Sequence, residues 1–174
     1  MSSNEWRKVK LGDLCEIVMG QSPSSEDCNS NGNGTPLLNG PTEFGLFCPQ
    51  AIQYTTNVKK QSNKGDLLFC VRGSTTGRMN WSDKEYALGR GLAAIRHKEG
   101  PMLKHLVKGL IEYKLVEILN SATGSTFPNV GKDLLNSLPV SIPSIIEQKA
   151  IADTLSSLDD KIELNNKINH NLAA

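Results

Sequence analysis

The sequence lacks the motifs that mark catalytic centres in enzymes acting on nucleic acids or nucleotides. It has no Asn-Pro-Pro-aromatic tetrad, which amino-methyltransferases use to hold a flipped base. It has no Gly-x-x-x-x-Gly-Lys-Ser/Thr loop, so an ATP-driven motor of the P-loop class is excluded. It also has no carboxylate–carboxylate–lysine cluster of nuclease type, and Asp159-Asp160 is most simply solvated charge on a helix. We therefore expect a non-catalytic chain that needs no cofactor.

Cysteine, histidine and long apolar runs are also scarce. The four cysteines form no C-x-x-C pair, and the three histidines lie at no zinc-finger spacing from them, which argues against a metal site. We expect four free thiols, with Cys70 as a small buried hydrophobe inside an apolar run. No run approaches the ~20 apolar residues of a membrane span, and the first residues hold no apolar stretch of signal-peptide type. The expected location is the cytoplasm, with no contact to a membrane.

The sequence does contain an uneven distribution of charge. Residues 1–58 carry 3 basic and 6 acidic side chains, residues 59–132 carry 13 and 6, and residues 133–174 carry 3 and 6. The whole chain is close to neutral, at +1, but its middle is strongly basic. A basic centre between acidic ends is expected for a protein that binds a polyanion, although chance clustering on a solvated face is the alternative.

The first 100 residues predict short strands and many turns. Residues 6–19 indicate two short elements around a turn at Gly12-Asp13, and residues 20–36, dense in Gly, Ser, Asn and Pro, indicate a long loop. Further short strands are expected within 37–58 and 86–97. The apolar run in residues 65–72 predicts a buried strand, and a small polar loop follows it at 73–78.

The hydrophobic period changes after residue 100. Residues 102–120 place apolar side chains on one helical face, with Gly109 inside the helix, and a polar loop, a short turn and an extended segment follow up to residue 143. Ser144 and Glu147 have capping-box spacing and begin a segment without Pro or Gly that continues to Ala174. This segment predicts a helix about 45 Å long, at about 1.5 Å per residue.

The long helix carries a heptad-like seam. Its positions are Ile151, Leu155, Leu158, Ile162, Asn165, Asn169 and Leu172. A helix of this length cannot bury its whole stripe on one small domain, so its distal half needs a partner, and the two asparagines would set the register. The alternative is an ordinary terminal helix that folds back, but the persistent stripe favours a coiled coil.

The predicted fold class is α+β. A β-rich domain with packed helices is expected over residues 1–143, and a long coiled-coil-forming helix over residues 144–174.

Short motifs follow one another in a specific order along nearly the whole chain. The first are Trp6-x-x-Val9-x-Leu11-Gly12-Asp13-Leu14, Gly20-Gln21-Ser22-Pro23, Lys64-Gly65-Asp66-Leu67-Leu68 with Val71-Arg72-Gly73-Ser74, and Gly89-Arg90-Gly91-Leu92-Ala93-Ala94-Ile95. The later ones are Gly124-Ser125-Thr126, Val130-x-Lys132-x-x-Leu135, Leu138-Pro139-x-x-x-Pro143, Glu147-Gln148-x-x-Ile151-Ala152 and Leu158-Asp159-x-Lys161-Ile162. Each is weak alone. The ordered set resembles one target-recognition domain and one spacer helix of a type I restriction–modification specificity subunit.

The resemblance implies a subunit that recognises a double-stranded DNA sequence and directs methylation and cleavage by its partners. The implied partners are modification (methyltransferase) subunits, which dock around the helix, and a restriction (motor and nuclease) subunit. Such subunits usually carry two recognition domains and two helices paired antiparallel, whereas this sequence has one of each. It looks like half a subunit, as a natural half-length product, a truncated gene or an engineered fragment, and this implies a homodimer through the helix.

Polar loops with Gly, Ser, Thr and Arg suit duplex recognition. Gly permits close backbone approach, hydroxyls bond phosphate oxygens, and Arg can pair bidentately with guanine. Two loops have this composition, Arg72–Arg78 and Gly124–Lys132. The alternative for both loops is an ordinary turn. Arg90, between two glycines, is a further candidate, and its alternative role is a surface ion pair. The candidate DNA-binding residues are Gln21, Ser22, Arg72, Ser74, Thr75, Thr76, Arg78, Arg90, Ser125, Thr126 and Lys132.

Two other functions stay open at this point. In the first alternative, the chain is a fragment of a fused restriction–methyltransferase. In the second it docks on the modification subunit through its helix and competes with a full-length subunit, without reading DNA.

Overall fold

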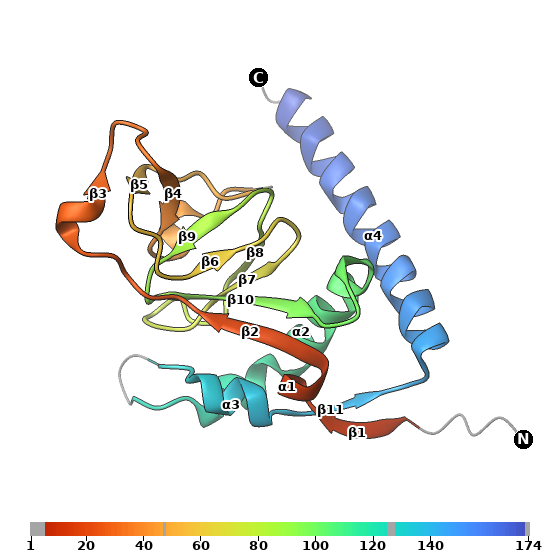
Figure 1. Cartoon of the computed structure of the whole chain (residues 1–174). Coiled ribbons are helices and arrows are strands. Elements are labelled where there is room, and N and C mark those ends of the chain that lie inside the picture. The colour runs from red at the N-terminus through yellow and green to blue at the C-terminus, as the bar shows by residue number, and fades with distance from the viewer. Residues whose placement is uncertain (1–5, 47, 125–127, 173–174) are drawn as a thin grey trace, which may run out of the picture.

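A computed structural model of the chain describes residues 6–46, 48–124 and 128–172 (Figure 1). Its helices are α1 (Leu11–Leu14), α2 (Lys104–Ser121), α3 (Lys132–Ser137) and α4 (Ile145–Leu172), with 3-10 turns η1 (Ser25–Asp27), η2 (Pro41–Glu43) and η3 (Pro101–Leu103). Its strands are β1 (Arg7–Lys10), β2 (Cys15–Met19), β3 (Cys28–Asn29), β4 (Thr35–Leu38), β5 (Gln53–Thr55), β6 (Gln61–Ser62), β7 (Leu67–Cys70), β8 (Met79–Trp81), β9 (Tyr86–Leu88), β10 (Leu92–His97) and β11 (Pro139–Ile142).

A four-stranded antiparallel sheet, in the order β2-β10-β7-β8, forms the middle layer of the domain. Alternate residues of β7 enter two different cores. Leu67 and Phe69 pack on the side of the helices, whereas Leu68 and Cys70 pack on the opposite side. Burial on both faces explains why this strand is a continuous apolar run rather than an alternating one. The predicted buried strand, and the buried position of Cys70, are confirmed.

Different layers cover the two faces of this sheet. Helices α1, α2 and α3 contribute Leu11, Ile111 and Leu135 to the core on one face. On the other face a five-stranded sheet, in the order β3-β5-β4-β9-β6, contributes Leu38 and Tyr86. Within this second sheet β4 and β9 pair in parallel, and the other pairs are antiparallel. A separate two-stranded ribbon of β1 and β11 leads into α4.

Two predicted irregular segments have more structure than the sequence indicated. The turn expected at Gly12-Asp13 is part of the four-residue helix α1. The long loop over residues 20–36 contains η1 and β3, and its polar side chains bond one another. Asp27 accepts hydrogen bonds from Ser24 Oγ at 2.6 Å and Asn57 Nδ2 at 2.9 Å, and these bonds lower the pKa of its carboxyl group.

Helix α2 has two apolar sides. Val107, Ile111 and Ile118 face the core of the domain, while Leu106 packs against α4. Gly109 lies on the second side, and a Cβ added there would lie 3.1 Å from Leu155 Cδ1 of α4. This glycine therefore allows α4 to pack closely against α2. The sequence pattern alone indicated only that glycine weakens a helix slightly.

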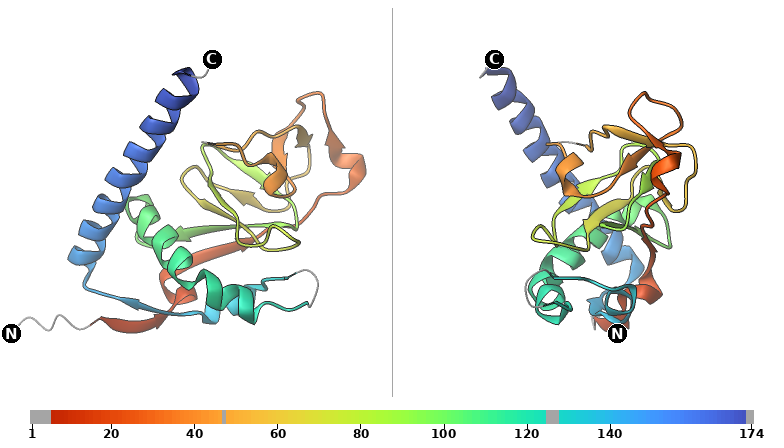
Figure 2. Two further views of the ribbon diagram at one scale, coloured as in Figure 1. Left: turned by 180° about the vertical axis from the view of Figure 1, so that it is seen from behind. Right: turned by 90° about the vertical axis from the view of Figure 1, so that its left-hand side faces the viewer.

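Helix α4 begins where the capping box predicts. The Glu147 N–H donates to Ser144 Oγ at 3.4 Å, and the Ser144 N–H donates to Glu147 Oε2 at 3.1 Å. The helix has 28 residues, which corresponds to about 42 Å. It rises from the β1–β11 ribbon and extends past α2 (Figure 2). None of the helices in the described part of the chain is long and apolar enough to span a membrane.

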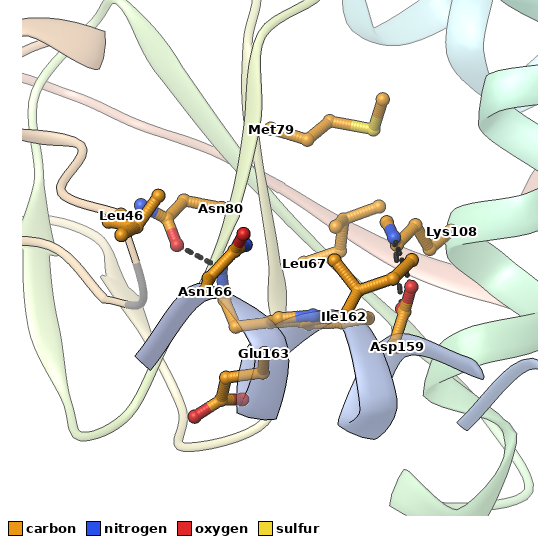
Figure 3. A pocket seen from close by; sticks show the side chains of 10 residues that line it. Leu46, Leu67, Met79, Asn80, Lys108, Asp159, Ile162, Glu163 and Asn166 are labelled. Atoms are coloured by element: carbon orange, nitrogen blue, oxygen red, sulfur yellow. Dashed lines mark hydrogen bonds and ion pairs between the residues drawn. The ribbon is translucent and has the colours of Figure 1, made fainter. Parts of the chain in front are cut away.

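A polar cluster attaches the middle of α4 to α2. Lys108 Nζ donates to both carboxylate oxygens of Asp159, at 3.0 and 2.9 Å, and His105 Nδ1 lies 3.1 Å from Asp159 Oδ2. Beyond this cluster Ile162 and Asn166 line a pocket between α4 and the domain (Figure 3). Partial burial raises the pKa of Asp159, but the hydrogen bonds from Lys108 and His105 outweigh it and hold the pKa below its ordinary value.

The seven predicted seam positions do not share one environment. Ile151 and Leu155 are half-buried, and Ile151 packs with Leu106 in the small core between α2 and α4. Leu158, Ile162 and Leu172 are 52, 57 and 81% exposed. Asn165 and Asn169 are exposed as well. The first two seam residues therefore attach the helix to its own domain, Ile162 borders the pocket between α4 and the domain, and the side chains of Leu158 and Leu172 are open.

We expect the Asp159→Ala variant to lose roughly 1–2 kcal/mol of unfolding free energy, because two charge-assisted contacts between α4 and α2 disappear. Asp160→Ala is the matched control, since Asp160 is exposed on the next position of the helix, and it should change stability by less than about 0.5 kcal/mol. Urea denaturation measures both values.

The same contacts make a pH prediction. A carboxyl group with a lowered folded-state pKa stabilises the fold fully above its unfolded pKa of about 3.9, and the contribution is lost as the pH falls through the folded pKa. The difference between wild type and Asp159→Ala should therefore vanish in acid below that range. A difference independent of pH would contradict the assignment of this cluster.

Candidate nucleic-acid interface

The register of the middle sheet brings several polar turns to one end. Met19, the last residue of β2, pairs with Ala93 near the start of β10, and Cys70, the last residue of β7, pairs with Leu92. The ends of β2 and β7 and the starts of β8 and β10 therefore coincide. In Figure 1 this end lies on the left, on the opposite side of the molecule from α4.

Five segments meet at this end and are here called the loop edge: residues 20–22, 39–40, 72–78, 89–91 and 128–130. Backbone hydrogen bonds connect them in series. The Gly20 N–H donates to Leu92 O at 2.8 Å, the Val71 N–H to Gly91 O at 2.9 Å, and the Val130 N–H to Val71 O at 2.8 Å. The loop edge is thus a bonded surface rather than a set of independent loops.

The turn at residues 89–91 has two glycines because other backbone segments press against it. A Cβ at Gly91 would lie 2.4 Å from Asn39 O, and one at Gly89 would lie 3.0 Å from Asn39 Cα. Between them the Arg90 N–H donates to Ser22 Oγ at 3.2 Å, while the Arg90 side chain is exposed. The turn therefore fixes the backbone of an arginine and leaves its guanidinium free to contact a ligand.

The hairpin loop between β7 and β8 is attached to residues 128–130. Thr76 Oγ1 donates to Gly73 O at 2.7 Å and to Pro128 O at 3.1 Å. The Arg72 Nε donates to Asn129 Oδ1 at 3.2 Å, which orients an otherwise exposed guanidinium. A planar guanidinium held by its inner nitrogen keeps its outer donors available for bidentate pairing with a base edge or phosphate.

The structure groups most of the predicted DNA-binding residues. Their side chains are exposed at Gln21, Ser22, Arg72, Ser74, Arg78 and Arg90, all on the loop edge. Thr75 and Thr76 lie there too but are half-buried, and the hydroxyl proton of Thr76 is used inside the loop. Lys132 lies apart, at the first position of α3. Ser125 and Thr126, and the neighbouring Phe127, fall outside the described residues.

Several residues on or beside the loop edge were not predicted. The Nδ2 group of Asn39 donates a hydrogen bond to Gln53 Oε1 at 2.8 Å, and Asn39 is exposed beside the turn at residues 89–91. Lys60 and Lys98 lie along the outer side of β2. The sequence indicated only a turn at Asn39-Gly40-Pro41 and a basic middle of the chain. It did not show that these residues lie close to the loop edge, because that depends on strand pairing.

The ionisable side chains of the loop edge define its chemistry. No three His, Cys, Asp or Glu side chains within the described ranges are grouped as metal ligands would be. The charged residues of the loop edge are Arg72, Arg78 and Arg90, and all three are exposed. The chemistry available here is hydrogen bonding and charge attraction to an anionic ligand.

Comparisons with known proteins bear on this geometry. The family description "Type I restriction modification DNA specificity domain" matches residues 3–174. The "Putative type I restriction enzyme MjaX specificity subunit" of Methanocaldococcus jannaschii is 34% identical over 165 residues, which cover 94% of this chain and 39% of that protein.

Two solved structures are similar over nearly the whole chain. One, described as the "structural basis underlying complex assembly and conformational transition of the type I R-M system", aligns with a TM-score of 0.77 and 28% identity, covering 99% of this chain and 42% of that chain. The other, an HsdS subunit from Thermoanaerobacter tengcongensis, aligns with a TM-score of 0.75 and 28% identity, covering 97% and 40%. The chain thus spans about two fifths of the length of the relatives that it matches.

Proposed function

We propose, since this chain belongs to the type I restriction–modification DNA specificity family, that it recognises a double-stranded DNA sequence through its loop edge. The observation that carries the proposal is the convergence of three exposed arginines on one bonded surface, Arg72 and Arg78 from the β7–β8 loop and Arg90 from the turn at residues 89–91. In this proposal the exposed side chains contact DNA and the backbone bonds between the turns hold their relative positions. The α+β fold with a long terminal helix matches the similar structures of this family.

The proposed division of labour separates reading from chemistry. The chain acts as a non-catalytic specificity module in the cytoplasm, residues 1–143 being the recognition domain and residues 144–174 the spacer. Methylation and cleavage belong to modification and restriction subunits that bind to it. Family membership supports this assignment over a fused-enzyme fragment, whose catalytic half would have to lie elsewhere.

We further propose that two copies pair through α4. Support comes from the divided seam, because Leu158, Ile162 and Leu172 remain more than half exposed while the helix is already attached to its own domain by Ile151 and Leu155. Pairing would bury this stripe, and Asn165 and Asn169 would set the register. Two identical readers related by two-fold symmetry would recognise an interrupted palindrome.

The test of DNA recognition is selection from random DNA. The purified chain, alone and with its modification subunit, is incubated with a library of random-sequence duplexes, and bound DNA is sequenced after repeated rounds. We expect an enriched, interrupted and symmetric motif. Binding of the modification subunit with no enrichment of any sequence would contradict the proposal and would instead support a competitor that docks without reading DNA.

The exposed arginines give a sharper prediction on the enriched duplex. Arg90→Gln or Arg72→Gln should weaken its binding about ten- to a hundredfold, since a bidentate base contact contributes roughly 1–3 kcal/mol. Lys149→Gln is the control, because Lys149 is exposed on the first turns of α4 at the opposite side of the molecule. Fluorescence anisotropy measures both affinities. Equal losses on enriched and random duplexes would mean that these arginines contact phosphates rather than bases.

The pairing of α4 predicts a change in solution mass. The wild-type chain should have twice the mass of one chain, and Leu158→Glu should yield a monomer, because it buries a charge in the seam. Leu164→Glu is the matched control, since Leu164 is 57% exposed, close to the 52% of Leu158, but lies outside the seam. Light scattering distinguishes the two states, and a wild-type monomer at micromolar concentration would exclude the dimer.

A further inference from the structure

A groove runs along the outer side of β2 and meets the loop edge at Gly20 and Gln21. Its wall is formed by Cys15–Met19 and Gly20, and its opposite side by Lys132 and Asn136 of α3. Strand β2 is the edge strand of the middle sheet, so the groove follows the full length of an unpaired strand edge. Gln21 lines one end of it, which joins the groove directly to the loop edge.

Three lysines surround this groove although they come from distant parts of the sequence. Lys60 precedes β6, Lys98 follows β10, and Lys132 begins α3, and all three are exposed. Lys98 is also held in place, because its Nζ donates to Gly12 O at 2.6 Å and Asp13 O at 3.1 Å. The groove therefore has one lysine whose ammonium group is held by backbone carbonyls and two further exposed lysines.

The negative charge at the groove is small and partly compensated. Glu16 is the acidic residue that lines it, and its Oε2 lies 3.5 Å from Arg96 Nη1. Burial raises the pKa of the Cys15 thiol to about 12, so this part of the wall stays neutral at physiological pH. Three like charges around one open groove repel one another, and an anion that crosses it relieves this repulsion.

We infer that the β2 groove is a phosphate track, in which Lys60 and Lys132 contact the sugar–phosphate backbone of a DNA duplex as it leaves the loop edge. The inference rests on the proposed function and extends it, because it adds a sequence-independent contact to the base-reading loops. Lysines suit this role as mobile point charges, whereas the oriented arginines of the loop edge suit directional pairing. The shared Gln21 end gives the two regions one continuous surface.

The salt dependence of binding to a random-sequence duplex tests this inference. The logarithm of the binding constant falls with the logarithm of salt concentration by about 0.9 per phosphate contact. Lys60→Gln and Lys132→Gln should each reduce this slope by about 0.9, and the double variant by about twice that amount. Lys60→Arg and Lys132→Arg keep the charge and should keep the slope, and Lys149→Gln should leave it unchanged.

A second readout separates this inference from the proposed function. The affinity ratio between the enriched and random duplexes should stay within about twofold of wild type in the lysine variants, because phosphate contacts carry no sequence information. An unchanged slope in Lys60→Gln and Lys132→Gln, with a wild type that selects a sequence, would overturn the phosphate track alone. A loss of sequence preference in Lys60→Gln or Lys132→Gln would also overturn it. Failure of the wild type to select any sequence would count against the proposed function instead.

Discussion

Burial of the middle sheet on both faces is the constraint on which the rest of this structure depends. The helices cover one face of β7 and β10, and the second sheet covers the other. Neither face can carry a ligand site without exposing the core, so a ligand site in this layer has to lie at the strand ends or at an outer edge of the sheet. The antiparallel register then brings the ends of β2 and β7 together with the starts of β8 and β10. The loop edge follows directly from this arrangement.

The same constraint separates two kinds of polar contact. The turns at the strand ends are short and bonded to one another, so an arginine such as Arg90 extends from a fixed backbone. The edge of β2 lies beside α3 and offers a groove with lysines at its rim. A duplex bound to both surfaces would contact the oriented arginines of the loop edge and, beside them, the lysines of the β2 groove. This is the usual division between contacts that read bases and contacts that position the backbone.

Helix α4 is attached along only part of its length, and the chemistry of its faces explains why. Near its start, α4 makes apolar contacts with α2, and Gly109 allows Leu155 to approach closely. Further along, Asp159 contacts Lys108 and His105, and Ile162 lines the pocket between α4 and the domain. The apolar residues Leu158 and Leu172 stay exposed. One helix therefore carries both an internal attachment and an open stripe, which the proposed second copy would cover.

The sequence by itself determined the local features of this protein. The capping box at Ser144 and the apolar run of β7 depend on residues close together in the chain, and both were predicted and confirmed. The helix α2 was predicted as well, but its apolar residues form two sides rather than the single face expected. The ordered motifs likewise indicated the family. The tertiary structure alone decided which distant residues share a surface, because strand pairing brings Lys60 beside Lys132 and Arg72 beside Asn129. It also decided how the seam divides, since a heptad pattern repeats along a helix whereas only some of its positions lie against the domain.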